Sequence, residues 1–168
     1  RWMVSILWPL FRTAGHQVRT QFGVSPSDPG RQKHGDVEIV SYLQDAAGAR
    51  NLVFDLRITH DRYGKSAQPH HNGQLTHPND LDAPLRIAAK SKIDDYREQY
   101  ANNQNISFLP AMTSTSTRMH GEFLRLLFLQ AHRETTAHFT ALGMPAQQHC
   151  DSFRYRREAF YNGLKSKV

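Results

Sequence analysis

The segment NLVFDLRIT, residues 51–59, constrains the fold of this chain more than any other. Side chains alternate between the two faces of a β-strand. One face would carry Leu52, Phe54, Leu56 and Ile58, and the other Val53, Asp55, Arg57 and Thr59. The wholly apolar face predicts a strand with one side buried in a core. The opposite face combines an acid, a base and a hydroxyl, which is an unusual set for so hydrophobic a strand and indicates a function.

The remaining segments predict an α/β fold in a chain of 168 residues, a length typical of one domain. Helices are expected at 2–11, 81–101, 119–142 and 146–166, and strands at 15–24, 35–43, 51–59 and 105–112. The order α-β-β-β-α-β-α-α, with a crossover helix before the fourth strand, predicts a mixed sheet of about four strands flanked by helices. We expect a main domain over 1–145, with a basic aromatic helix within 146–168 packed on it.

Turn-forming, capping and strand-breaking residues set the expected boundaries of these elements. A turn is expected at 25–30, and the aperiodic segment 60–80 is expected to be a long loop. Asp80 is expected to cap the helix that follows this loop. Pro110 is expected to stop the fourth strand, and the Ser/Thr run 113–117 to cap the next helix.

The charge of the chain favours an anionic partner. The net charge is +6, and ten histidines can add to it below neutral pH. A basic balance of this kind is typical of nucleic-acid-binding proteins. The single cysteine, Cys150, excludes an internal disulfide framework and predicts a reducing compartment, nuclear or cytoplasmic rather than secreted.

The N-terminal apolar segment 2–11 does not predict a membrane partner. It is too short to span a bilayer, contains Pro9, and has no small-residue cleavage site typical of a signal peptide. Because the sequence begins with Arg1 rather than Met, we expect it to be a piece of a longer protein.

Two acids on consecutive strands form the candidate chemical site. If strands 35–43 and 51–59 pair as a hairpin, Asp36 and Asp55 approach each other near one edge of the sheet. Two carboxylates provide the oxygen ligands that Mg²⁺ (or Mn²⁺) prefers, and Glu38 shares the face of Asp36 as a further candidate ligand. Arg57, two residues after Asp55, can hold a phosphate.

The helix expected at 81–101 offers a lysine to this site. On a helical wheel its apolar stripe comprises Leu81, Leu85, Ala88, Ala89, Ile93, Tyr96 and Tyr100. Lys92 falls in the middle of the stripe, whereas Lys90 points to the opposite, solvent side. Two interpretations are open for Lys92. Its stem packs while the amine escapes to water, or its amine meets the carboxylates, with Tyr96 one turn further on.

These segments together resemble a known family. GDV (35–37), FDLRIT (54–59), AAKSKIDDY (88–96) and ISFLPAMTSTSTRMHGEF (106–123) follow one another in the order found in the C-terminal domain of some non-LTR retrotransposon polyproteins. Those domains follow the reverse transcriptase and are similar to PD-(D/E)XK restriction-enzyme-like endonucleases. The resemblance covers about residues 12–142.

The resemblance implies a restriction-endonuclease-like fold that nicks DNA with a metal ion. It implies that Asp36 and Asp55 bind the metal, that Lys92 is the catalytic lysine and that Tyr96 is the accompanying tyrosine. Arg57 stands where a restriction enzyme has the lysine of its triplet, and the family carries that lysine on the helix instead. The implied partner is DNA, or the RNA template of a retroelement.

Other interpretations remain open at this point. A catalytically inactive remnant could still bind nucleic acid through Arg57, Lys90 and the tail arginines Arg154, Arg156 and Arg157. The histidines of the 60–80 loop, His60, His70, His71 and His77, suit zinc but lack helical spacing, and a solvated loop is the alternative. The apolar segment 122–132 is either core or one half of a dimer interface.

Overall fold

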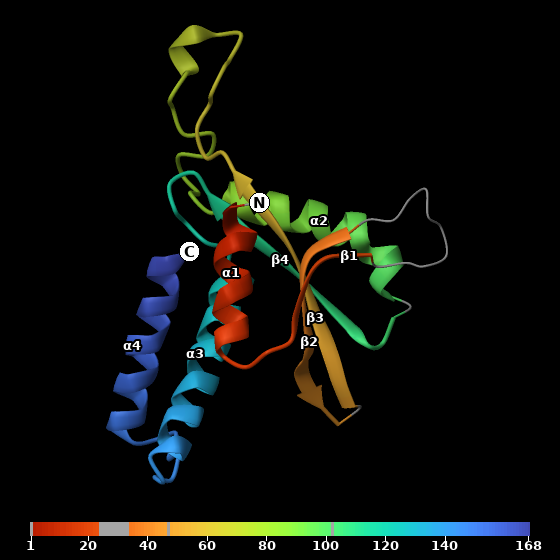
Figure 1. Ribbon diagram of the computed structural model, residues 1–168. Coiled ribbons are helices and arrows are strands. Elements are labelled where there is room, and N and C mark those ends of the chain that lie inside the picture. Colours follow the sequence, from red (N-terminus) through yellow and green to blue (C-terminus); the bar gives the residue numbers. More distant parts are fainter. Residues whose placement is uncertain (1, 24–33, 47, 102) are drawn as a thin grey trace.

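The order of elements expected from the sequence is confirmed. The computed structural model describes residues 2–23, 34–46, 48–101 and 103–168 (Figure 1). Its elements are α1 (Trp2–Thr13), β1 (Val18–Gly23), β2 (His34–Asp45), β3 (Gly48–Thr59), the short 3-10 helix η1 (Pro69–His71), α2 (Ala83–Ala101), β4 (Ile106–Ser114), α3 (Gly121–Ala141) and α4 (Asp151–Lys167). The turn expected at 25–30 lies outside the described residues.

The four strands form one mixed sheet in the order β1-β2-β3-β4. Antiparallel pairing joins β1 to β2 and β2 to β3, whereas β3 and β4 are parallel. The parallel pair requires a crossover, and α2 provides it. The chain is therefore a mixed α/β protein, as the sequence predicts.

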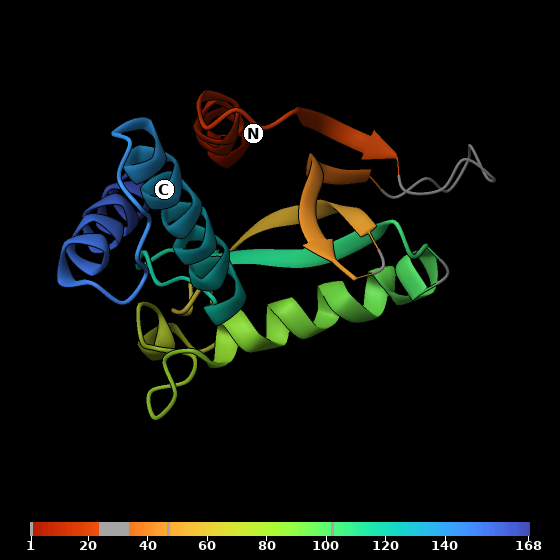
Figure 2. The same cartoon turned by 90° about the horizontal axis from the view of Figure 1, so that it is seen from below.

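The two faces of the sheet have different covers. Figure 2 shows α2 along one face and α1 and α3 on the other, with α4 outside α3. The main core lies on the α1 and α3 side and includes Leu7, Phe11, Val37, Ile39, Phe54, Phe123 and Leu127. A smaller apolar cluster under α2 comprises Leu85, Ala88, Ala89 and Met112. Most of the apolar burial is thus on one side of the sheet.

A bulge in β2 changes the expected alternation. The register with β3 shifts between Ile39 and Leu43, and Ser41 has a φ of 52°. The Asn51 side-chain oxygen accepts a hydrogen bond from the Ser41 backbone N–H at 2.9 Å, which holds the bulge. As a result Tyr42 turns into the main core. Strict alternation along β2 would instead place Tyr42 on the face of Asp36.

The predicted C-terminal end of β4 and the predicted cap of α3 are also wrong, whereas the Asp80 carboxylate does accept a backbone hydrogen bond from Asp82 just before α2. Pro110 lies inside β4, which continues to Ser114. An edge strand tolerates proline because the missing N–H can face away from the neighbouring strand. Helix α3 is capped by His120, whose Nδ1 accepts from the Glu122 N–H at 3.4 Å. The Asp80 carboxylate pairs with the Arg86 guanidinium.

The Ser/Thr run has a different partner from the one expected. The hydroxyls of Thr115 and Ser116 donate to the carboxylate of Asp61, at the start of the 60–80 loop. The backbone N–H of Thr115 donates to the Thr59 carbonyl at 2.9 Å. These contacts fix the base of the loop, which projects beyond the end of β3 (Figure 1).

Two helices match their apolar patterns only in part. In α2 the residues Leu85, Ala88, Ala89 and Tyr96 are buried, but Leu81 and Ile93 are well exposed, against the prediction. Leu81 precedes the helix, and Ile93 lies at the margin of the stripe. In α3 the core expectation holds for Phe123, Leu126 and Leu127, whereas Phe128 and Leu129 are exposed to about the same extent as Leu81. No helix within the described part of the chain is both long and apolar enough to cross a membrane.

Candidate functional site

The two acids lie on the same face of neighbouring strands. Val37 lies opposite Phe54 and Glu38 opposite Val53, so the antiparallel register brings Asp36 level with Asp55. The backbone N–H of Leu56 donates to Asp36 Oδ2 at 2.7 Å and ties this carboxylate to β3. Both acids stand on inner strands and face α2. The expected pairing is therefore present, but on the face of the sheet rather than near an edge.

The approach of these strands depends on Gly35. A Cβ at this position would lie 2.4 Å from Val53 Cγ1, well inside van der Waals contact. A side chain here would push β2 away from β3 and separate the two acids. Close packing against Val53 therefore explains why a glycine precedes Asp36.

Lys92 meets the acids, as one of the two interpretations predicted. Its Nζ lies 2.6 Å from Asp55 Oδ2. The Asp55 residue is 6% exposed, and the Lys92 side chain is 24% exposed. The hydroxyl of Tyr96, one turn further along α2, donates to Asp55 Oδ1 at 3.5 Å. Escape of the Lys92 amine to water, the other interpretation, is wrong.

The electrostatics of this cluster favour a further cation. Burial raises the pKa of Asp55, and the nearby charge of Asp36 raises it further, although Lys92 and Tyr96 oppose the shift. Two carboxylates face one ammonium, which leaves an excess of negative charge. Burial together with Asp55 and Asp36 raises the pKa of Tyr96 to about 12, so Tyr96 remains a hydrogen-bond donor at neutral pH.

An aromatic stack supports Tyr96. The ring centroid of Phe108 on β4 lies 4.8 Å from that of Tyr96 and 4.8 Å from that of Tyr100. The Phe108 ring is stacked on Tyr100 and tilted against Tyr96, and aromatic packing of this kind fixes side-chain orientation. A role for Phe108 was not predicted, although its alternation with Pro110 and Met112 in β4 is visible in the sequence.

Glu38 is engaged in holding strands together. It is completely buried. Its Oε1 accepts from the Asn51 side-chain nitrogen at 2.7 Å, and its Oε2 lies 3.6 Å from Arg19 Nη1. Glu38 therefore links β1, β2 and β3. The sequence analysis had assigned no role to Arg19 or Asn51.

The basic residues expected to contact nucleic acid do not form one surface. Arg57 is exposed on the strand that carries Asp55, and Lys90 is exposed on α2. The arginines of α4 lie beyond α3, on the opposite side of the sheet (Figure 2). Of these, Arg154 pairs with Asp151 at 3.3 Å, Arg156 is exposed, and Arg157 lies 4.6 Å from the Phe128 ring centroid.

The histidines of the 60–80 loop are mostly solvated. His60, His70 and His77 are exposed, and His71 stacks on Tyr63 with ring centroids 5.8 Å apart. Within the described ranges, no group of three or more His, Cys, Asp or Glu side chains is arranged to hold a metal ion. The acid site on the α2 face accordingly consists of two carboxylates, not three.

Comparison with protein-family models, with curated proteins and with solved structures finds no match for this chain.

Proposed function

We propose that this chain is a metal-dependent DNA endonuclease domain of the restriction-endonuclease-like kind, part of a retroelement protein, that nicks DNA. The observation that carries the proposal is the contact of Lys92 with Asp55 on a face shared with Asp36. A lysine inside an apolar helix stripe, aimed at paired carboxylates, is the arrangement that phosphodiester hydrolysis needs.

Asp36 and Asp55 fit a magnesium ion. Mg²⁺ is commonly bound by one or two carboxylates together with waters and substrate phosphates. The raised pKa of Asp55 reflects burial beside a second carboxylate, a setting that a divalent cation relieves. When bound, the metal would neutralise charge on the phosphodiester and lower the pKa of the attacking water. Glu38 is left out of this site because Asn51 and Arg19 already engage it.

The residues of the chain have distinct parts in this proposal. The Lys92 ammonium orients the attacking water and stabilises negative charge that develops on the phosphate. Tyr96 and the Leu56 N–H hold the two carboxylates in place. Arg57, exposed two residues beyond Asp55, holds a phosphate of the bound strand.

A plasmid-nicking assay tests the proposal. The protein should convert supercoiled plasmid to the nicked circle with Mg²⁺ and not with a chelator. Asp55→Asn and Lys92→Ala should each lower the rate at least about a hundredfold. Arg97→Ala is the matched control, since it removes an exposed cation from the same helix that has no part in the proposed site. Equal rates for wild type and Lys92→Ala, or nicking without metal, would contradict the proposal.

The second candidate is a nucleic-acid-binding domain that does not cut. It is favoured by the direct ion pair, in which Lys92 already engages the Asp55 carboxylate. Electrophoretic mobility shifts at two salt concentrations test this alternative, because phosphate contacts weaken with salt. Salt-dependent DNA binding that Asp55→Asn preserves, with no cleavage by either protein, would favour the non-cutting domain.

A further inference from the structure

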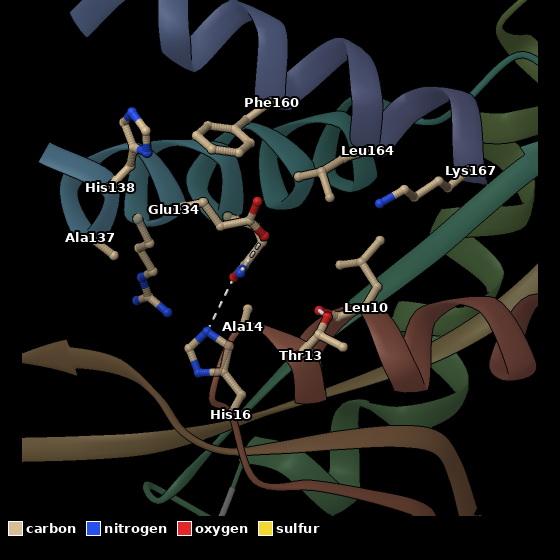
Figure 3. Close-up of a pocket in the computed structure, with 12 residues that line it drawn as sticks. Leu10, Thr13, Ala14, His16, Glu134, Ala137, His138, Phe160, Leu164 and Lys167 are labelled. Carbon is tan, nitrogen blue, oxygen red and sulfur yellow. Dashed lines mark hydrogen bonds between the residues drawn. The ribbon is translucent and has the colours of Figure 1, made fainter. Parts of the chain in front are cut away.

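A cavity of about 550 Å³ lies on the opposite side of the sheet from the acid site. Its walls come from the end of α1, from the middle of α3 and from the C-terminal half of α4 (Figure 3). This volume falls within the range of small-molecule sites in proteins. None of the residues in the proposed endonuclease site lines it, so an inference about the cavity does not rest on that function.

The floor of the cavity is a fixed polar network. Gln130 on α3 is completely buried. Its Oε1 accepts from the Tyr42 hydroxyl at 3.3 Å and lies 3.2 Å from His16 Nε2, and its Nε2 donates to Glu134 Oε1 at 3.1 Å. Burial and the nearby Arg133 charge lower the pKa of His16, which favours its neutral imidazole. The network therefore holds Glu134 at the cavity without adding charge from the histidine.

The charged lining has more cations than anions. Arg133 and Lys167 line the cavity together with the single carboxylate Glu134. Arg133 is held rigidly, with its guanidinium 3.9 Å from the Tyr42 ring centroid and a hydrogen bond to the Tyr42 carbonyl. In the part of the chain that the structure describes, neither cation makes an ion pair within 4.0 Å.

Apolar side chains complete the lining. Leu10 from α1 and Phe160 and Leu164 from α4 border the same space. Figure 3 shows Phe160 and Leu164 on α4 facing Leu10 on α1 across the space, with the Lys167 amine and the Glu134 carboxylate directed toward it. Apolar surface beside cations matches a ligand that has an apolar body and a negative group.

We propose that this cavity binds a small organic anion, with its negative group on Lys167 and its aromatic or aliphatic body against Leu10, Phe160 and Leu164, whereas Arg133 is engaged by Tyr42 and adds positive charge to the lining. The negative group can be a phosphate or a carboxylate, since both accept hydrogen bonds from an ammonium group. Glu134 disfavours ligands with more than one negative group near it and favours a ligand that also offers a hydrogen-bond donor.

Calorimetric titration of the full chain tests the ligand class. The probes are adenosine 5′-monophosphate and indole-3-acetate, an aromatic phosphate and an aromatic carboxylate. At least one should bind with a Kd on the order of 10⁻⁴ M. Adenosine, indole, inorganic phosphate and acetate lack either the charge or the body, and each should bind at least about tenfold more weakly. Which aromatic anion binds identifies the negative group; binding of neither at millimolar concentration would overturn the proposal.

Charge variants locate the binding site in the same titration. Lys167→Met should weaken binding of the aromatic anion about threefold to tenfold, because a partly exposed ion pair is lost. Glu134→Gln should tighten it, because a repelling charge is removed. Lys165→Met is the matched control on α4, since the Lys165 amine lies 5.4 Å from the Tyr161 ring centroid and does not line the cavity. Equal weakening by Lys167→Met and Lys165→Met, or no tightening by Glu134→Gln, would overturn the assignment.

Discussion

The same two strands supply both the main core and the acid site, from alternate residues. Toward α1 and α3, β2 and β3 present Val37, Ile39 and Phe54, all fully buried. Toward α2 they present Asp36, Glu38 and Asp55, two of them buried carboxylates. One face of the sheet therefore has apolar packing that stabilises the fold, and the other has polar groups whose burial costs free energy.

The free-energy cost of burying carboxylates on the α2 face indicates a function more strongly than the apolar packing on the other face does. Burying an apolar side chain such as Phe54 contributes about 1.5–3 kcal/mol. A structural ion pair usually lowers the pKa of its carboxylate. The pKa of Asp55 is instead raised, because burial and Asp36 outweigh the help from Lys92. An arrangement that does not optimise stability is typical of functional sites.

The largest effect on stability is expected on the apolar face. Phe54→Ala removes a fully buried ring whose centroid lies 6.0 Å from that of Phe11, and should lower the free energy of unfolding by about 3–5 kcal/mol. Ile58→Ala is the matched control, because Ile58 lies on the same face of the same strand but is 50% exposed. It should cost less than about 1 kcal/mol. Urea denaturation measures both, and similar losses would contradict the division between the two faces.

Ile58 also shows how far the sequence could predict the fold. Alternation in residues 51–59 correctly gives the faces of Leu52, Phe54 and Asp55, but it cannot say where the covering helices end, so Ile58 was expected to be buried. Helical periodicity in the same way gives the position of Lys92, because the helical stripe is a local property of the sequence. The contact of Lys92 with Asp55 then follows from a helix packing on the predicted face.

Features that depend on contacts distant in sequence could not be predicted. The bulge that turns Tyr42 into the core depends on the Asn51 side chain reaching the Ser41 N–H. The partner of Ser116 is Asp61, which lies in a different loop. The position of α4 beyond α3 likewise separates its arginines from the acid site, and no local pattern indicates that separation.

A smaller effect is expected where the two strands approach each other. Gly35→Ala places a Cβ against Val53 and should cost about 1–3 kcal/mol, measured by urea denaturation. The double variant Gly35→Ala with Val53→Ala removes the clashing Cγ1, so the two changes should cost less together than their sum. Gly163→Ala is the control, and it should raise the free energy of unfolding where Gly35→Ala lowers it. This α4 glycine has open space around its Cβ position, and alanine should stabilise the helix by up to about 1 kcal/mol. Additive losses at Gly35 and Val53 would show that the close approach is not tight.

The smallest effect is a change of stability with pH at Asp55, and its sign tests the comparison of the two faces. Because the folded pKa is raised, the contribution of Asp55 to stability is fully present below the unfolded value of 3.8 and is lost as the pH rises through the folded pKa. Asp55→Asn removes this loss. The difference in unfolding free energy between the variant and wild type should therefore move in favour of the variant as the pH rises above 3.8.

Chemical denaturation of both proteins at several pH values measures that difference. Asp94→Asn reports the effect of removing an exposed carboxylate from α2, where Asp94 pairs with Arg97 at 2.7 Å. If the Lys92 pair dominated instead, the difference would move in favour of wild type as the pH rises, and Asp55 would be a stabilising ion pair like those of other proteins. A shift toward Asp55→Asn, together with loss of nicking in that variant, would show that the α2 face carries the acid at the expense of stability because the reaction requires it.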